Sequence, residues 1–234
     1  MKYARFLFAI LSMIILFCTL SINVCALNTG FAVENFSDEQ LNKISNNFKI
    51  TSLQSEPKRN AIDCFAVSES GMVAIGCSSS VDKTVCVYSD NGVFEYGYKF
   101  ETYGTFGLDF DGDNVIIYLV RSGAAILVNK SAEIESIFKI SDTKENTRYW
   151  NNHVYSNKHT ALGKTYFLRN DMGVLNIVAT SYSQLIVLDE NGESSVIYDV
   201  NANQLTKTLI ILVLVCGFVA VVIFVIIRSF RHIE

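Results

Sequence analysis

The sequence lacks the short motifs on which most common enzyme sites depend. It contains no Gly-x-Ser-x-Gly elbow, no glycine-rich phosphate loop and no Cys-x-x-Cys pair, and only two histidines lie between residues 27 and 204. Serine-hydrolase, nucleotide and zinc chemistry are therefore not indicated. The formal net charge of −4 also differs from the basic footprint of a nucleic-acid-binding protein. We expect no catalysis, no cofactor, no metal and no nucleic-acid partner.

Charge is also absent from a long stretch near the C-terminus. Residues 208–227 carry no charged side chain, and as a helix this stretch is long enough to cross a hydrocarbon core about 30 Å thick. Lys207 and Arg228 flank it, and the tail beyond it is basic, which places the tail in the cytoplasm. We therefore predict a transmembrane helix at residues 205–228 and a cytoplasmic tail at residues 229–234.

A second charge-free stretch, residues 6–22, lies near the N-terminus. It follows Lys2 and Arg5 and precedes small residues at positions 24–26, the pattern of a secretory signal peptide cleaved after residue 26. The alternative is an uncleaved anchor, because about 17 apolar residues can span a bilayer. With cleavage, the mature chain crosses the membrane once, and residues 27–204 form an extracytoplasmic domain.

A repeated pattern organises this extracytoplasmic region. Residues 85–100, 125–140 and 185–200 each combine an apolar strand, a turn and an alternating strand, which predicts a β-hairpin. Two more apolar runs precede each hairpin, at residues 64–67 and 72–77, 106–110 and 115–120, and 166–168 and 174–179. Four antiparallel strands at a period of about 40 residues are typical of a β-propeller blade. We expect three four-stranded, propeller-like units at residues 62–101, 102–141 and 142–201.

The units resemble the blades of NHL-like bacterial β-propeller proteins, through apolar hairpins that turn at sequences such as Asp90-Asn91-Gly92. The resemblance implies a ring of blades with a binding face made by its loops, and usually no catalysis. Three units are fewer than the four to eight blades of typical propellers. Either two chains make the ring, or the units form an open stack, or they close in a barrel-like way.

The pattern also predicts which side chains the closing strand of each unit buries. Aromatic residues occupy the equivalent inward positions, at Tyr98, Phe138 and Tyr198. Because strand side chains alternate, the residues that follow should face solvent, namely Lys99, Lys139 and Asp199.

The residues before the first unit differ from the repeat. Ser37 and Gln40 form a capping-box pair that predicts one short helix at about residues 38–46. Residues 48–50 then resemble a fourth closing strand. An open stack would leave this strand and residues 196–200 at its edges, and we expect both to be covered, by each other, by the short helix or by a second copy.

Three cysteines lie in the predicted domain: Cys64, Cys77 and Cys86. If residues 81–82 centre a hairpin, Cys77 and Cys86 are directly opposite on neighbouring strands, where a disulfide is geometrically possible. The alternative is three small buried hydrophobic residues, which the odd number of cysteines favours.

Two segments remain as candidate sites. Residues 109–114 alternate carboxylates like a calcium loop, but the glycine is misplaced and a solvated turn is the better interpretation. Residues 141–160 form an insertion in the third unit. We predict that its aromatic and basic residues bind a ligand or partner, because such residues dominate binding hot spots: Arg148, Tyr149, Trp150, His153 and Tyr155. The alternative is that Trp150 closes the end of an open core.

These features favour two functions. The first is a membrane-tethered binding module for a protein or other ligand. The second is a structural subunit that completes a shared β assembly, either with a protein partner or as a homo-oligomer. An enzyme is less consistent with the motifs.

Overall fold

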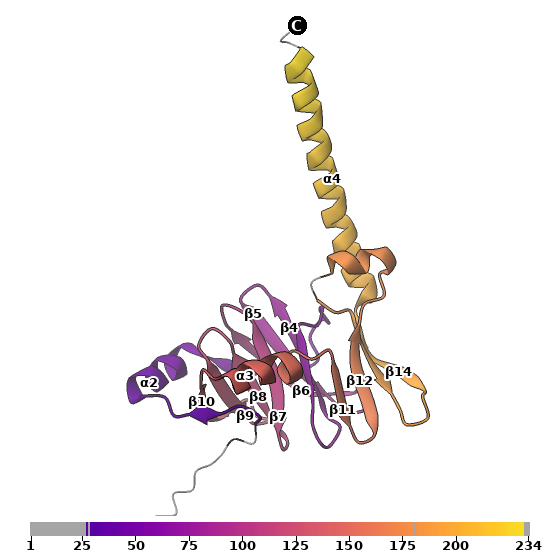
Figure 1. Cartoon of the computed structure of the whole chain (residues 1–234). Helices are drawn as coiled ribbons and strands as arrows, with labels where there is room; N and C mark the ends of the chain where they lie inside the picture. The colour runs from indigo at the N-terminus through magenta and orange to yellow at the C-terminus, as the bar shows by residue number, and fades with distance from the viewer. Residues whose placement is uncertain (1–26, 28, 180, 232–234) are drawn as a thin grey trace, which may run out of the picture.

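The computed structural model describes residues 27, 29–179 and 181–231. Over these residues the chain is mainly β, with three antiparallel sheets and a long C-terminal helix (Figure 1). This confirms the predicted mainly β chain with one C-terminal apolar helix. The predicted signal peptide and the last three residues of the predicted tail lie outside the described residues.

Each sheet contains four consecutive strands, joined by short connections except between β12 and β13, where residues 170–183 intervene. Sheet 1 comprises β3 (Cys64–Val67), β4 (Val73–Ser79), β5 (Asp82–Tyr88) and β6 (Phe94–Glu101). Sheet 2 comprises β7 (Phe106–Asp111), β8 (Asn114–Leu119), β9 (Ala124–Val128) and β10 (Ile134–Ile140). Sheet 3 comprises β11 (Lys158–Ala161), β12 (Lys164–Arg169), β13 (Gln184–Leu188) and β14 (Ser194–Asp199). The three hairpins that the sequence predicted are therefore present, as β5–β6, β9–β10 and β13–β14.

Sheets 1 and 2 each gain a fifth strand from the N-terminal part of the chain. Strand β2 (Ile50–Ser52) pairs antiparallel with β6, and β1 (Val33–Glu34) pairs antiparallel with β10. The prediction of three four-stranded units is thus wrong for two of them, since the sheets have five, five and four strands. Of the alternatives for covering the first and last closing strands, pairing with each other does not occur, because β2 lies in sheet 1 and β14 in sheet 3.

The third unit departs most from the predicted pattern. The apolar run that was expected to be a strand forms the 3₁₀ helix η2 (Gly173–Val178), and β11 and β12 supply the two leading strands instead. The extra residues of this unit are consequently divided between two insertions. One is a helical segment before β11, and the other is η2 between β12 and β13.

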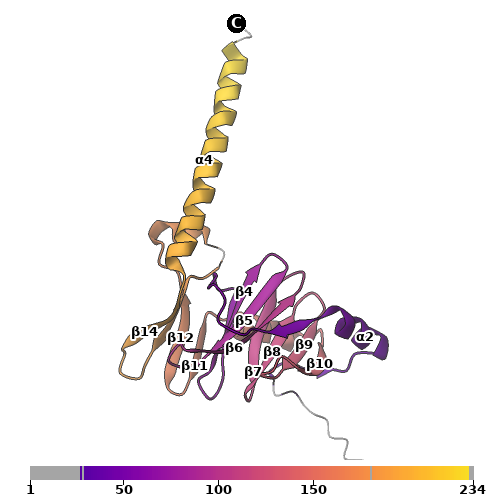
Figure 2. The ribbon, with the colours of Figure 1, turned by 180° about the vertical axis from the view of Figure 1, so that it is seen from behind.

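The sheets pack face to face in the order 3, 1, 2 (Figure 2). Residues of sheets 1 and 2 share one buried cluster, and residues of sheets 1 and 3 share another. Tyr98 is fully buried in the first and Tyr198 is 2% exposed in the second, as predicted. Phe138 is only half-buried, because the free face of sheet 2 is covered by the N-terminal segment and by the insertion at residues 141–160 rather than by a further sheet.

The three cysteines are buried and free, which agrees with the favoured interpretation and not with the possible disulfide. The β4–β5 turn is centred one residue earlier than assumed, so Cys77 pairs with Thr84 and Cys86 with Ile75. The expectation that Cys77 and Cys86 lie directly opposite is therefore wrong. Both thiols and that of Cys64 are free and buried, and burial raises their pKa, to about 11 for Cys77. Such thiols are poor nucleophiles.

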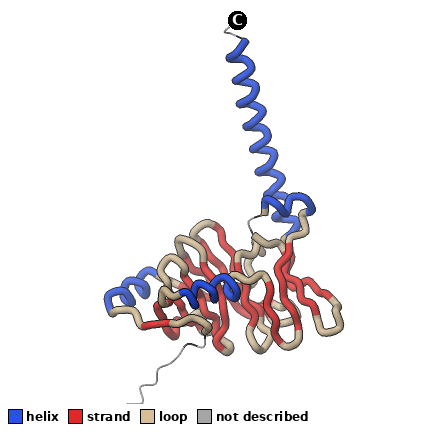
Figure 3. Tube along the Cα trace, viewed as in Figure 1, coloured by secondary structure: helices blue, strands red, loops and turns tan. Residues whose placement is uncertain are grey.

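Two helices border the sheets. Helix α2 (Asp38–Asn47) begins at the predicted cap, where the Ser37 hydroxyl accepts a hydrogen bond from the Gln40 amide. Helix α4 (Asn201–Arg231) follows β14 with one intervening residue and rises from the sheets as a single rod (Figure 3). Residues Asn201–Phe224 are long and apolar enough to cross a membrane, and none of the most apolar part is buried in the protein.

Candidate functional site

The first insertion of the third unit folds into a short helical segment. Helix α3 (Lys144–Tyr149) begins at Thr143, whose hydroxyl accepts a hydrogen bond from the Asn146 amide at 3.1 Å, and it continues into one π-helical turn, η1 (Trp150–Val154). The π turn packs against β3 and β7, and the methyl group of Val154 lies where any side chain at Gly107 would clash. The insertion is therefore a fixed part of the fold rather than a projecting loop.

Asn146 joins this insertion to the N-terminal segment. Its side chain accepts a hydrogen bond from the Ala32 amide at 2.8 Å and donates to the carbonyl oxygens of Ala32 and Ser141 at 2.9 and 2.6 Å. Only 3% of Asn146 is exposed, so these bonds replace its contacts with water. They hold Phe31 against the insertion.

Phe31 is the centre of an aromatic cluster. Its ring lies 4.6 Å from that of Tyr149, 4.8 Å from that of Trp150 and 4.8 Å from that of Tyr118 in sheet 2. Phe31 packs edge-on against Tyr149 and at a tilt against Trp150. Such packing stabilises aromatic pairs beyond their buried area. Tyr149 and Trp150, two of the predicted binding residues, thus cover the free face of sheet 2. This matches the alternative in which Trp150 closes an open core.

The other predicted binding residues lie at the border of this cluster. His153 stacks on Tyr149, and Tyr155 stacks on Trp150 with ring centres 5.4 Å apart. Tyr155 is 44% exposed, and Arg148 is exposed and takes part in none of these ring contacts within the described residues. The structure therefore brings four of the five predicted residues together. Arg148 and Tyr155 are exposed, whereas Tyr149, Trp150 and His153 are partly buried.

Asp109 of β7 is the polar centre beneath the insertion. One carboxylate oxygen accepts hydrogen bonds from the hydroxyls of Tyr149 and Tyr118 at 2.7 and 3.3 Å, and His153 Nε2 lies 3.3 Å from the same oxygen. The second oxygen accepts from the Phe110 amide. The side chain is 13% exposed. Protein donors rather than water therefore satisfy this carboxylate.

The environment of Asp109 also sets the protonation of its neighbours. Burial raises the pKa of Asp109, but the hydrogen bonds from His153 and Tyr149 outweigh it, so the pKa lies below its usual value. Burial, assisted by the charge of His153, lowers the pKa of nearby His159 to about 4. At neutral pH the centre therefore combines a carboxylate with a neutral His159. The Asp109–His153 pair resembles part of a general acid–base site. The other side chains that donate to Asp109 are tyrosines, and their rings pack in the aromatic cluster.

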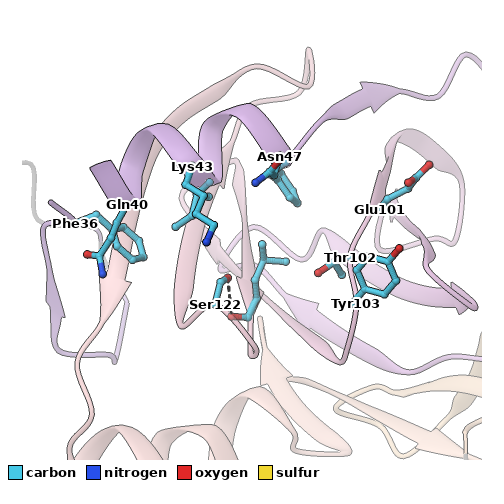
Figure 4. A pocket seen from close by; sticks show the side chains of 11 residues that line it. Phe36, Gln40, Lys43, Asn47, Glu101, Thr102, Tyr103 and Ser122 are labelled. Carbon is cyan, nitrogen blue, oxygen red and sulfur yellow. Dashed lines mark hydrogen bonds between the residues drawn. The ribbon is translucent and has the colours of Figure 1, made fainter. Parts of the chain in front are cut away.

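A pocket of about 640 Å³ lies elsewhere, under helix α2 (Figure 4). No residue of α2 is buried, and the helix is held at its end by Phe48, whose ring is 5.2 Å from that of Phe100. The pocket walls come from α2, from the β6–β7 connection and from the β8–β9 end of sheet 2. Its lining residues are Phe36, Gln40, Lys43, Ile44, Asn47, Phe48, Glu101, Thr102, Tyr103, Leu119 and Ser122.

The composition of this pocket suits an amphipathic ligand. Ile44 and Leu119 supply apolar surface, while Lys43 and Glu101 place opposite charges on separate walls. Tyr103 is 72% exposed at the rim. The sequence predicted α2 but not the pocket, because its walls come from segments far apart in the chain. The only signal for the pocket in the sequence was the set of apolar positions on this helix, none of which is buried in the structure.

The described residues contain no group of three or more His, Cys, Asp or Glu side chains placed to hold a metal ion. A tight turn at residues 112–113 joins β7 to β8 (Asn114–Leu119), which agrees with the turn interpretation, but Asp109 lies within β7 with only 13% of its side chain exposed and is not a solvated turn residue. The sequence matches no protein-family model, and no curated protein is similar to it.

Proposed function

We propose that this chain is a single-pass membrane protein whose sheets form an extracytoplasmic binding module. Helix α4 supplies the anchor, and the signal-peptide pattern with the basic tail supplies the orientation. The observation that carries the binding assignment is the pocket under α2, which is large enough for a small ligand or several side chains of a partner. In this proposal the module acts by binding and not by catalysis.

The proposed architecture is an incomplete propeller. The packing order of the sheets supports it. So does the contact of β3, the edge strand of sheet 1, with the edge strands β7 and β11 of the other two sheets. The likeness of the hairpins to NHL-like repeats is consistent with it. In this architecture the insertion α3–η1 takes the place of the next blade on sheet 2.

A structural subunit is the second candidate function, and strand β14 favours it. Within the described residues β14 pairs only with β13, whereas β6 and β10 each carry an added strand. Val196 in β14 is 53% exposed. An open edge with apolar surface is a template for another chain.

Photo-crosslinking in the native membrane separates these functions. A photoreactive phenylalanine analogue is placed at Tyr103 on the pocket rim, or at Tyr155 on the insertion, in the full-length protein. The two positions are matched, because both are exposed tyrosines. We expect an adduct at Tyr103, with the partner identified by mass spectrometry. An adduct at Tyr155 alone would move the site to the insertion, and adducts only between copies would favour the subunit.

A second variant tests the insertion without damaging the core. Tyr149 and Trp150 are packing residues, so their removal would unfold the cluster whatever its function. Arg148→Ala removes an exposed side chain, and Tyr155→Ala removes a 44% exposed ring that stacks on Trp150 at the border of the cluster. We expect partner recovery and oligomer size to be unchanged in this variant. If this variant no longer recovers the partner while its oligomer size is unchanged, the binding site lies at the insertion.

A further inference from the structure

Two aliphatic side chains of η2 project almost completely into solvent. Val174 is 84% exposed and Ile177 is 90% exposed, more than any other large hydrophobic residue in the described part of the chain. Because a 3₁₀ helix has three residues per turn, positions 174 and 177 lie on the same side. The pair therefore forms one small contiguous apolar projection, which is a candidate contact rather than a single scattered side chain.

The first turn of α4 holds η2 in place from both sides. The Asn201 amide group donates to the Asp171 carbonyl oxygen at 2.7 Å, before η2, and the Gln204 amide group donates to the Ser181 carbonyl oxygen at 2.9 Å, after it. Met172, which caps η2, is only 6% exposed. Figures 1 and 2 both show η2, in orange, beside the base of α4.

This position corresponds to the surface of the membrane that α4 would cross. Gln204 precedes the charge-free stretch at residue 208 by four residues, which is about 6 Å along a helix. The headgroup layer on each side of a bilayer is about 5–8 Å thick. Lys207, the last charge before the span, lies three residues, or about 4.5 Å, closer to the charge-free stretch than Gln204. The apolar projection thus lies beside α4 at the depth of the headgroups.

We propose that η2 is a second membrane contact, in which Val174 and Ile177 insert into the interfacial layer of the bilayer that α4 crosses. The inference rests on the proposed membrane anchorage by α4. The occupant is lipid, because the projection is continuous with the membrane helix and presents aliphatic groups, which suit the boundary between headgroups and acyl chains. Together with α4 it gives the domain two attachments to the bilayer, which couple the orientation of the domain to that of α4.

Fluorescence quenching on the full-length protein in phosphatidylcholine vesicles tests this placement. Single cysteines are introduced as Ile177→Cys, Val196→Cys or Val215→Cys, in a Cys216→Ala background, and labelled with an environment-sensitive dye. Val196 is the matched exposed aliphatic control, five residues or about 16 Å of strand before α4. Val215 reports on α4 itself. Quenchers are nitroxide lipids labelled at shallow or deep positions, and aqueous iodide.

We expect the Ile177 label to be quenched at least threefold more by shallow nitroxide lipid than the Val196 label, and to be protected from iodide. Equal iodide quenching at both positions would overturn the inference. Protection from iodide without lipid quenching would indicate a protein contact and would also overturn it. Failure of deep nitroxide lipid to quench the Val215 label would instead contradict the transmembrane helix, and the inference with it.

Hydrogen exchange gives an independent measurement. Val174→Asp with Ile177→Asp alters only exposed side chains, so the sheets should remain folded. In vesicles we expect amides 173–178 to exchange at least tenfold faster in this variant, with β13 amides unchanged. Identical exchange in both proteins would contradict the proposed insertion.

Discussion

Ala132 occupies the turn position of the second hairpin that glycine occupies in the other two. Its φ angle is +66°, against +77° for Gly92 and +83° for Gly192. A residue with a Cβ atom is strained in this left-handed region. We expect Ala132→Gly to raise the free energy of unfolding by about 0.5–1 kcal/mol, measured by chemical denaturation.

The reciprocal change provides the control for this prediction. A Cβ atom added at Gly192 meets no other atom within 4 Å, so Gly192→Ala isolates the backbone effect. This variant should lose about 1 kcal/mol of stability. If both variants shift stability in the same direction, the left-handed turn cannot explain either result.

His159 should make the stability of the protein depend on pH. Its Nε2 is buried without a hydrogen-bond partner among the described residues, and its ring packs edge-on against Phe65. Burial lowers its pKa from 6.5 to about 4, so the unfolded chain binds a proton that the folded chain does not. The neutral His159 therefore contributes fully to the free energy of unfolding above pH 6.5. As the pH falls from 6.5 to 4, the free energy of unfolding decreases by about 2–3 kcal/mol.

Thermal or urea denaturation between pH 4 and 7 measures that dependence. The variant His159→Phe removes the titrating group and keeps an aromatic ring beside Phe65. We expect its stability to change less over this interval than that of the wild type. Parallel profiles for the two proteins would show that another group controls the acid response.

At the scale of elements, Tyr198 of β14 binds sheet 3 to the connection between β2 and β3 of sheet 1. Its hydroxyl donates to the Asn60 carbonyl oxygen at 2.7 Å and accepts from the Asn60 amide at 2.9 Å, while the Arg59 guanidinium lies 5.0 Å from its ring. We expect Tyr198→Ala to cost about 3–5 kcal/mol of unfolding free energy. Tyr198→Phe should cost about 1–3 kcal/mol, because it removes the partner of the Asn60 amide and leaves the Asn60 carbonyl oxygen with only the weak Cys77 thiol donor.

The same experiment on the second hairpin serves as the comparison. Phe138 is equivalent in sequence but only half-buried, so Phe138→Ala should cost less than Tyr198→Ala. Equal costs would mean that sheet 2 is packed as tightly on its covered face as sheet 3 is on sheet 1.

Local signals in the sequence were sufficient for the hairpins, for α2 and for the apolar helix. Turns such as Asp90-Asn91-Gly92 and the cap at Ser37 act within a few residues, and the structure has both. Pairing of β1 with β10 could not be predicted in this way. It joins residues more than a hundred positions apart, and the two-residue strand β1 has no periodicity to detect.

The errors at η2 and at the insertion have a different cause. Residues 174–179 are as apolar as a buried strand, and composition alone does not distinguish a strand from a segment that exposes its apolar side chains. Trp150 and Tyr149 have the residue types of a binding hot spot, yet they fill a core whose other half is Phe31. The pocket under α2 could not be predicted from local signals, because its walls come from that helix and from sheets 1 and 2.

At the scale of the whole molecule, the open edge of β14 predicts a difference in hydrogen exchange. Strand β2 covers part of the edge of β6, but no described strand covers β14. In the full-length protein in detergent, amides 194–199 should exchange faster than amides 94–101, as measured by mass spectrometry. Equal protection of both strands would mean that another segment or a second copy covers β14.

The proposed topology is tested by protease treatment of intact cells. If residues 27–204 are extracytoplasmic, added protease should remove the chain before Lys207 and leave a small membrane fragment. Permeabilised cells provide the control for access to the tail. Protection of the sheets from protease in intact cells would contradict the proposed orientation.

The junction of β14 and α4 has a mechanical consequence. Only Val200 separates the strand from the helix, and Asn201 and Gln204 bind the neighbouring loop, so no flexible linker uncouples the two. A helix longer than the local hydrocarbon thickness tilts to fit. Any such tilt must be transmitted to the sheets as a rigid rotation. The thickness of the membrane would then set the angle at which the α2 pocket faces its surroundings.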